Sequence, residues 1–166
     1  MKSTEIYLQS ITNVDYTHFL DKYRGKCAAL HSHSSYFVNL YVRGKVVNDM
    51  VVDYKIIKQV VKSAIDLIDH KILIGTDVGF KVVGDATHIS YVAENGYHFF
   101  NIPSCEVYVM KSGRPTLENI CKELGEVVLK NLPENVDGVG FEMREGINNG
   151  AIVWIYREET GETYLK

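Results

Sequence analysis

The hydrophobic residues of this chain change their spacing along the sequence, and the order of these changes restricts the possible folds. Between 35 and 43 apolar and polar side chains alternate, which is typical of a half-buried strand. Between 54 and 68 apolar residues recur every three or four positions, as on the buried side of an amphipathic helix, and Asp53 can cap its N-terminus. A second helical pattern begins at Pro115-Thr116.

Further runs typical of strands precede, separate and follow the two helices. They lie at 5–11, 35–43, 78–110, 136–145 and 151–156. One face of the clearest strand carries Tyr36, Val38, Leu40 and Val42. Glu94-Asn95-Gly96 separates two β-rich runs and predicts a hairpin turn. The order of strands, helix, strands, helix and strands predicts an α+β fold with a mainly antiparallel sheet and two helices.

Composition excludes several classes of protein. A length of 166 residues suits one domain, and a net charge of −3 leaves no excess of positive charge for phosphate backbones, so we expect no nucleic-acid partner. No run approaches the roughly 18 apolar residues of a membrane span, and no apolar segment follows the N-terminus as in a signal peptide. The three cysteines are irregularly spaced, which argues against a disulfide framework and fits a reducing cytoplasm, where we expect the protein.

A His-x-His pair, His31 and His33, is the most informative motif for chemistry. On a strand, residues at i and i+2 point to the same face, so both imidazoles can bind one metal ion. A catalytic zinc site usually has three protein ligands, and His18 is the nearest histidine upstream. Three histidines also suit iron, copper or nickel. Such pairs also occur without a metal, as surface or hydrogen-bonded histidines.

Two further groups are candidates for proton transfer. Asp69 and His70 follow the first helix, and a carboxylate that holds an imidazole forms an acid–base pair. The alternative is a histidine that caps the helix C-terminus beside a solvated Asp69. Cys27 precedes the histidine pair and could act as nucleophile or base beside a bound cation. Its alternative role is that of a small buried hydrophobic residue.

Glu145 ends the strand predicted over 136–145. Val139, Phe141 and Met143 share its face, so we expect the carboxylate to point inward. Burial of a carboxylate is costly unless the group is paired. A ligand with adjacent N–H donors, such as the guanidine-like edge of a pterin, would satisfy both oxygens. The alternative is a frayed strand end with Glu145 in water.

In order and spacing these motifs resemble the 6-pyruvoyl-tetrahydropterin synthase and 6-carboxytetrahydropterin synthase family. The matching positions are His18, Cys27-x-x-x-His31-x-His33, Asp53-Tyr54, Asp69-His70, Pro115-Thr116-Leu117-Glu118-Asn119 and Glu145. The resemblance spans most of the chain apart from the segment between His70 and Pro115. Each motif is weak alone, and the set as a whole is specific.

The resemblance implies a fold and an assembly. The fold is the tunnelling fold, or T-fold, with two helices packed on one face of an antiparallel sheet. Subunits of this family join their sheets into an oligomeric barrel, commonly a homohexamer made of two trimers. The chain would form one such domain over 1–166, with an extended insertion at 74–112.

The resemblance also implies a role for each matching residue. The metal, Zn²⁺, would be bound by His18, His31 and His33. Protons would be transferred by Cys27, Asp69 and His70. The pterin ring would be bound by Glu145, with Thr116 and Glu118 near it. Four cations flank these residues in the sequence and are candidates for binding the triphosphate of the substrate: Arg24, Lys26, Lys71 and Arg114. The alternative for each of them is a solvated surface charge.

The spacing of the Cys27 motif separates two branches of the family. Three residues between Cys27 and His31 are typical of the carboxy branch, which feeds 7-deazaguanine and queuosine synthesis, whereas the pyruvoyl branch typically has a longer gap. The implied enzyme is a lyase that converts 7,8-dihydroneopterin triphosphate to 6-carboxy-5,6,7,8-tetrahydropterin, acetaldehyde and triphosphate. The alternatives are a 6-pyruvoyl-tetrahydropterin synthase, a different zinc hydrolase, and a T-fold binding module without catalysis.

The chain departs from the family pattern at several places. Ser32 stands between the paired histidines where glycine is usual, and a positive φ would be costly for serine. Gly146 follows Glu145 where threonine is common. The segment 74–112 is longer than the usual connection and could cover the active site, extend a subunit contact or narrow the substrate range.

Overall fold

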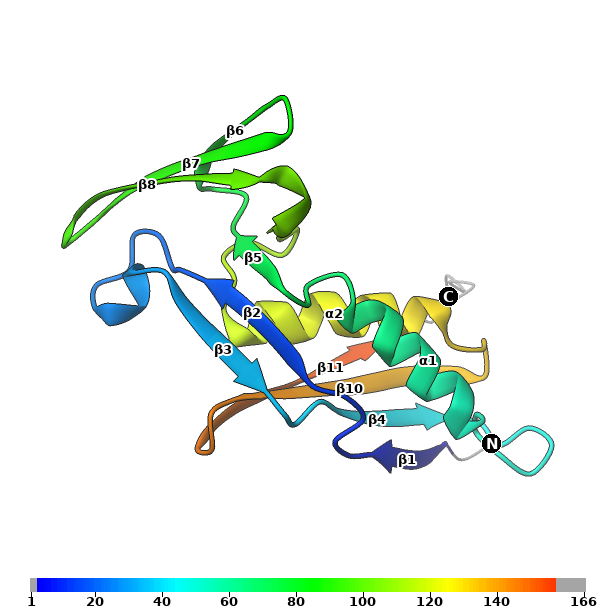
Figure 1. Ribbon diagram of the computed structural model, residues 1–166. Helices are drawn as coiled ribbons and strands as arrows, with labels where there is room; N and C mark the ends of the chain where they lie inside the picture. Colours follow the sequence, from blue (N-terminus) through cyan, green and yellow to red (C-terminus); the bar gives the residue numbers. More distant parts are fainter. Residues whose placement is uncertain (1–2, 158–166) are drawn as a thin grey trace, which may run out of the picture.

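The computed structural model describes residues 3–157, in which strands and helices follow one another in the predicted order (Figure 1). The strands are β1 (Thr4–Leu8), β2 (Val14–His18), β3 (His31–Ser35), β4 (Asn39–Gly44), β5 (Lys71–Ile74), β6 (Gly79–Val83), β7 (Ala86–Ala93), β8 (Gly96–Pro103), β9 (Val107–Val109), β10 (Val136–Glu145) and β11 (Asn149–Tyr156). The helices are α1 (Tyr54–Ile65) and α2 (Leu117–Asn131), with short 3-10 helices η1 (Lys26–Ala28) and η2 (Ser104–Glu106). No helix in these residues is long and apolar enough to cross a membrane.

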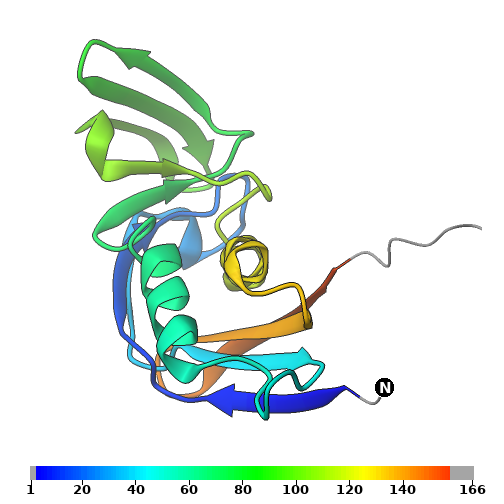
Figure 2. The same cartoon turned by 90° about the vertical axis from the view of Figure 1, so that its right-hand side faces the viewer.

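Two four-stranded sheets form a curved layer, and both α-helices lie on the same side of it (Figure 2). The first sheet has the order β1-β4-β10-β11 and is antiparallel, and the second has the order β3-β2-β5-β9. Helix α2 packs on β10 and β11, and α1 packs beside α2. The core between helices and sheet includes the fully buried Leu40, Ile57, Val61 and Phe141. The predicted α+β fold with two helices on one face is confirmed.

Two strand pairs are parallel, although the sequence pattern predicts a mainly antiparallel sheet. Strand β2 pairs with β5, and β5 pairs with β9, both in parallel. A parallel pair needs a long connection between its strands. Helix α1 lies in the connection from β2 to β5, and the segment between Ile74 and Val107 connects β5 to β9. The alternation of residues identifies a strand but does not identify its neighbours.

The single strand predicted over 35–43 is divided in two. Strand β3 ends at Ser35 and pairs with β2, whereas β4 begins at Asn39 and pairs with β1 and β10. The apolar face of β4 is fully buried as predicted, but Tyr36 is 67% exposed. The chain crosses from one sheet to the other at 36–38, and one alternating pattern runs through both strands.

The segment between β5 and β9 forms a three-stranded antiparallel sheet, β6-β7-β8, beyond the ends of β2 and β5 (Figure 1). Its hairpin turn lies at Glu94-Asn95, as predicted. A second, smaller core joins this sheet to the main body, and it contains Phe19, Ile74, Val78, Ile89 and Tyr91. Since Phe19 directly follows β2, the inserted sheet packs on the loop that leaves this strand.

Gly125 allows α2 to approach the sheet closely. A Cβ atom at this position would lie 2.3 Å from Cδ1 of Ile155 and 3.2 Å from Cβ of Phe141. We predict that Gly125→Ala lowers the free energy of unfolding by about 1–2 kcal/mol, because the packing cost exceeds the roughly 1 kcal/mol by which alanine favours a helix. Urea unfolding followed by circular dichroism measures the change. Glu126→Ala, at an exposed neighbour, is the control and should stay within about 0.5 kcal/mol. An unchanged or higher stability of Gly125→Ala would contradict the close approach.

Candidate functional site

Three histidines meet across the antiparallel pair of β2 and β3. His18 lies directly opposite His31 in the register, and His33 lies two residues further along β3 on the same face. The side-chain nitrogens that could bind a metal ion all lie within 4.8 Å of one another. The structure therefore confirms that His31 and His33 share one face of the strand, and it places His18 beside them as predicted.

Backbone carbonyls fix the orientation of two of these rings. Nδ1 of His18 lies 2.6 Å from the carbonyl oxygen of Pro115, and Nδ1 of His31 lies 2.7 Å from that of Ala29. A carbonyl oxygen only accepts, so each Nδ1 carries the proton and each Nε2 keeps a free lone pair. Nε2 of His18 is buried and has no hydrogen-bond partner within residues 3–157. A buried, unpartnered imidazole nitrogen beside two other imidazoles fits a metal ion such as Zn²⁺.

Glu145 ends β10 and brings its carboxylate to the histidines. Its Oε1 accepts a hydrogen bond of 2.9 Å from the hydroxyl of Tyr16 and lies 3.8 Å from Nε2 of both His18 and His33. Burial raises the pKa of the Tyr16 hydroxyl, and the Glu145 carboxylate raises it further, so the hydroxyl stays protonated and donates. The carboxylate of Glu145 thus points inward, as the strand pattern predicts, and faces the histidine cluster.

The surroundings of His18 and His33 lower the pKa of both side chains and so keep these two residues neutral. Burial lowers the pKa of His18 to about 4, although the Pro115 carbonyl and the Glu145 carboxylate act in the opposite direction. Burial also lowers the pKa of His33, again against an opposing effect of Glu145. A metal ion binds the neutral form of imidazole. Both side chains are therefore in the metal-binding form at neutral pH.

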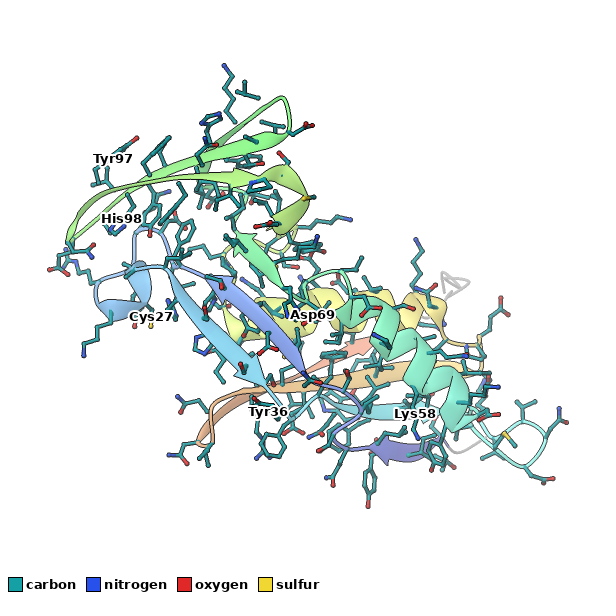
Figure 3. All side chains as sticks on the ribbon, viewed as in Figure 1. Cys27, Tyr36, Lys58, Asp69, Tyr97 and His98 are labelled. Carbon is teal, nitrogen blue, oxygen red and sulfur yellow. The ribbon has the colours of Figure 1, made fainter. Side chains whose placement is uncertain are left out.

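The residues predicted to transfer protons do not lie together in one chain. Cys27 is exposed on the loop of η1, whereas Asp69 lies in the turn between α1 and β5 (Figure 3). Oδ2 of Asp69 is 3.0 Å from Nδ1 of His70, and its Oδ1 accepts a hydrogen bond of 3.0 Å from the backbone N–H of Asp15. Helix α1 ends earlier, with Asp66 at its C-cap, so His70 does not cap it.

A cavity on the other face of β2 and β3 adjoins His70. Thr17 and Ser32 alternate with the histidines along these strands, so their side chains point to that opposite face. The cavity has a volume of about 320 Å³ and is lined by Thr17, Ser32 and His70 among others. Ser32 replaces the usual glycine without strain, because it is extended in β3 and its hydroxyl lies 3.0 Å from that of Thr17. His70 therefore borders the face toward which Thr17 and Ser32 point, whereas the histidines of β2 and β3 point to the opposite face, although His33 also belongs to the lining of this cavity.

The start of α2 lies against the histidine cluster, because the carbonyl of Pro115 accepts the hydrogen bond from His18. Thr116 caps the helix, with its hydroxyl oxygen accepting a hydrogen bond of 3.4 Å from the N–H of Asn119. Glu118 is exposed in the first turn. Thr116 thus has a structural role in starting α2, and the Glu118 carboxylate faces solvent.

The four cations considered for the triphosphate divide into two pairs. Arg114 and Lys71 each donate a hydrogen bond to a backbone carbonyl oxygen. Arg24 and Lys26 are exposed on the loop that carries Cys27. The second pair therefore presents its charges to solvent beside Cys27.

Sequence reasoning missed Tyr16 and the two orienting carbonyls. Tyr16 stands two residues before His18 on the same strand, so alternation alone would have placed it beside the cluster. The carbonyls of Ala29 and Pro115 carry no sequence signal, because every residue has one. Their importance comes only from where the chain brings them.

Comparison with known proteins agrees with this geometry. The family model described as 6-pyruvoyl tetrahydropterin synthase matches residues 7–155. A protein of Methanocaldococcus jannaschii named "Putative 6-carboxy-5,6,7,8-tetrahydropterin synthase" is 28% identical over 141 residues. This match covers 80% of the present chain and 83% of the relative.

Two solved structures share the fold. The 6-pyruvoyl tetrahydropterin synthase of Plasmodium falciparum matches with a TM-score of 0.78 at 22% sequence identity. The enzyme of the same name from Plasmodium vivax matches with a TM-score of 0.79 at 19% identity. Each match covers 95% of this chain and 100% of the other. At such identities the likeness establishes the fold.

We predict that the protein binds about one zinc ion per chain through the histidine cluster. Each of three variants removes one ligand: His18→Ala, His31→Ala and His33→Ala. Each should lower zinc affinity by more than about 100-fold, because loss of a residue that is only hydrogen-bonded to a metal ligand already lowers the affinity by about 10–100-fold. Cys27→Ala is the control and should retain zinc, because Cys27 lies outside the cluster. Elemental analysis after dialysis and competition with a chromophoric chelator measure these affinities. Zinc retained in all three histidine variants would show that the site is assigned wrongly.

Proposed function

Because the chain belongs to the 6-pyruvoyl tetrahydropterin synthase family, we propose that it is a 6-carboxy-5,6,7,8-tetrahydropterin synthase. In this proposal it converts 7,8-dihydroneopterin triphosphate to 6-carboxytetrahydropterin, acetaldehyde and triphosphate. The observation that carries the proposal is the histidine cluster beside Glu145, in which Nε2 of His18 has no partner among the described residues. The relative at 28% identity and the three residues between Cys27 and His31 support the carboxy product.

The histidine cluster and Glu145 would bind two different parts of the substrate, the oxygens of its side chain and its pterin ring. His18, His31 and His33 would hold Zn²⁺, which when bound supplies Lewis-acid polarisation of substrate oxygens. A carboxylate accepts up to about four hydrogen bonds, and Tyr16 uses one of them while fixing the Glu145 side chain. The remaining capacity suits the adjacent N–H donors of a pterin.

Cys27 would serve as the base, and Asp69 with His70 as the acid or relay. One chain holds the Asp69–His70 pair on the opposite face of β2 and β3 from the histidine cluster. We therefore propose that a neighbouring subunit supplies this pair to each active site. The exposure of Cys27 and of the His70 side chain supports such a contact. The resemblance to T-fold proteins supports a homohexamer of two trimers.

The proposed reaction belongs to 7-deazaguanine and queuosine synthesis, and we place it in the cytoplasm. Cys27, Cys105 and Cys121 are free thiols, which supports a reducing compartment. The net charge of −3 supports a small-molecule substrate and no nucleic-acid partner. Thr116 and Glu118 would border the substrate, since they follow Pro115 at the start of α2.

A second candidate is a 6-pyruvoyl-tetrahydropterin synthase. The name of the matching family favours it. Both candidates act on the same substrate and release triphosphate. They differ in product, because acetaldehyde is formed only in the carboxy reaction.

We predict that the zinc-loaded protein converts 7,8-dihydroneopterin triphosphate to a carboxy-pterin with release of acetaldehyde, detected by mass spectrometry. Cys27→Ala should lower kcat by about 100-fold or more, as expected for loss of a general base. A pyruvoyl product would assign the protein to the sister branch. Activity that survives in Cys27→Ala would favour a zinc hydrolase, and no turnover with zinc bound would contradict both candidates.

We predict that two inactive variants restore activity when they share one oligomer. His70 has a φ of 57°, a conformation that asparagine tolerates, so His70→Asn removes the imidazole with little backbone strain. Random mixing of His70→Asn and Cys27→Ala subunits leaves both groups intact in about one quarter of shared sites. Co-expression with two different tags and assay of the mixed oligomer measure the recovery. Recovery near zero would mean that each chain carries its own complete site.

A further inference from the structure

The inserted sheet β6-β7-β8 reaches the loop that carries Cys27. We propose that Tyr91 of this sheet is a positioning residue whose hydroxyl holds the loop 19–30, and through it the Cys27 thiol and the His31 ring. The inference rests on the proposed function only for the roles given to Cys27 and to zinc.

Tyr91 is held in place by stacked rings. Its ring stacks on Phe19, with centroids 4.2 Å apart and planes at 3°, and on His98, with centroids 4.7 Å apart and planes at 5°. Nε2 of His98 lies 2.8 Å from the side-chain oxygen of Asn95 in the hairpin turn. His98 lies above the Cys27 loop in the view of Figure 3. Because Tyr91 is 7% exposed, its hydroxyl has little choice of position.

The hydroxyl of Tyr91 donates a hydrogen bond of 2.6 Å to the carbonyl oxygen of Ala28. Ala28 is 2% exposed, so this carbonyl would lack a partner without the hydroxyl. The residue before it is Cys27, and the residue after it is Ala29, whose carbonyl orients His31. One hydroxyl thus fixes the peptide that links the predicted base to a candidate metal ligand.

The inserted sheet stands away from the loop near its hairpin turn. A groove of about 410 Å³ lies between Gly25-Lys26 and Glu94-Asn95. Among residues 3–157, the hydrogen bond from Tyr91 to Ala28 is the only direct hydrogen bond between the inserted sheet and the loop 19–30. The groove gives the loop room to move once that bond is removed.

Tyr91→Phe tests the proposal, because it removes the hydroxyl and keeps the stacked ring. Hydrogen–deuterium exchange of the zinc-loaded protein should become at least about fivefold faster for the amides of 20–29 and stay unchanged in α1 and β10. Tyr97→Phe is the matched control, since it removes a hydroxyl from the same hairpin at a residue 68% exposed. His98→Ala loosens the ring but keeps the hydroxyl, and it should accelerate exchange of the same amides by less.

Zinc affinity is the second readout. Tyr91→Phe should weaken zinc binding about tenfold, the lower end for disturbing a partner of a metal ligand, whereas Tyr97→Phe should not change it. Exchange and zinc affinity equal to those of the parent protein would overturn the proposal. Faster exchange across the whole chain would also overturn it, because Tyr91 would then be only a core residue. Neither readout uses the substrate, so failure of the proposed reaction is distinguishable from failure of this inference.

Discussion

The hydrogen-bonded ladder between β2 and β3 is the constraint on which the candidate site depends. Its register sets His18 opposite His31 and Tyr16 opposite His33, so four side chains of one face converge where the two strands meet. A slip by one residue would turn all of them to the other face. Burial enforces the register, because Val14, Tyr16 and His18 are buried on the face that the helices cover.

Distant segments complete what the ladder begins. Glu145 is 129 positions from Tyr16, and Pro115 is 97 positions from His18, yet both reach these side chains by hydrogen bonds. Tyr16, which is 2% exposed, donates the hydrogen of its hydroxyl to Glu145 and so fixes this carboxylate beside the histidines. Nε2 of His18 is left without a partner among the described residues, and an unsatisfied buried nitrogen costs about 1–3 kcal/mol. This cost is consistent with a site built for an ion.

The sequence allowed prediction of those features that depend on near neighbours along the chain. Asp53 caps α1, α2 begins directly after Pro115-Thr116, the hairpin turns at Glu94-Asn95, and the paired histidines share a face. The parallel pairing of β5 and the crossing of the chain at 36–38 were beyond such reasoning. They depend on which strands become neighbours, and the alternation of apolar and polar residues in a strand does not indicate which strand pairs with it. The separation of the Asp69–His70 pair from the cluster has the same cause.

The hydrogen bond between His18 and the Pro115 carbonyl ties the occupancy of the cluster to the docking of α2. An ion that binds the folded chain and not the unfolded one stabilises the fold by mass action. The carbonyl belongs to the residue just before the helix cap, so part of that stabilisation is passed to the helix N-terminus. A bound ion would therefore stabilise the folded state as well as take part in the reaction. The availability of metal in the cell would then affect how stably the N-terminus of α2 packs beside the cluster.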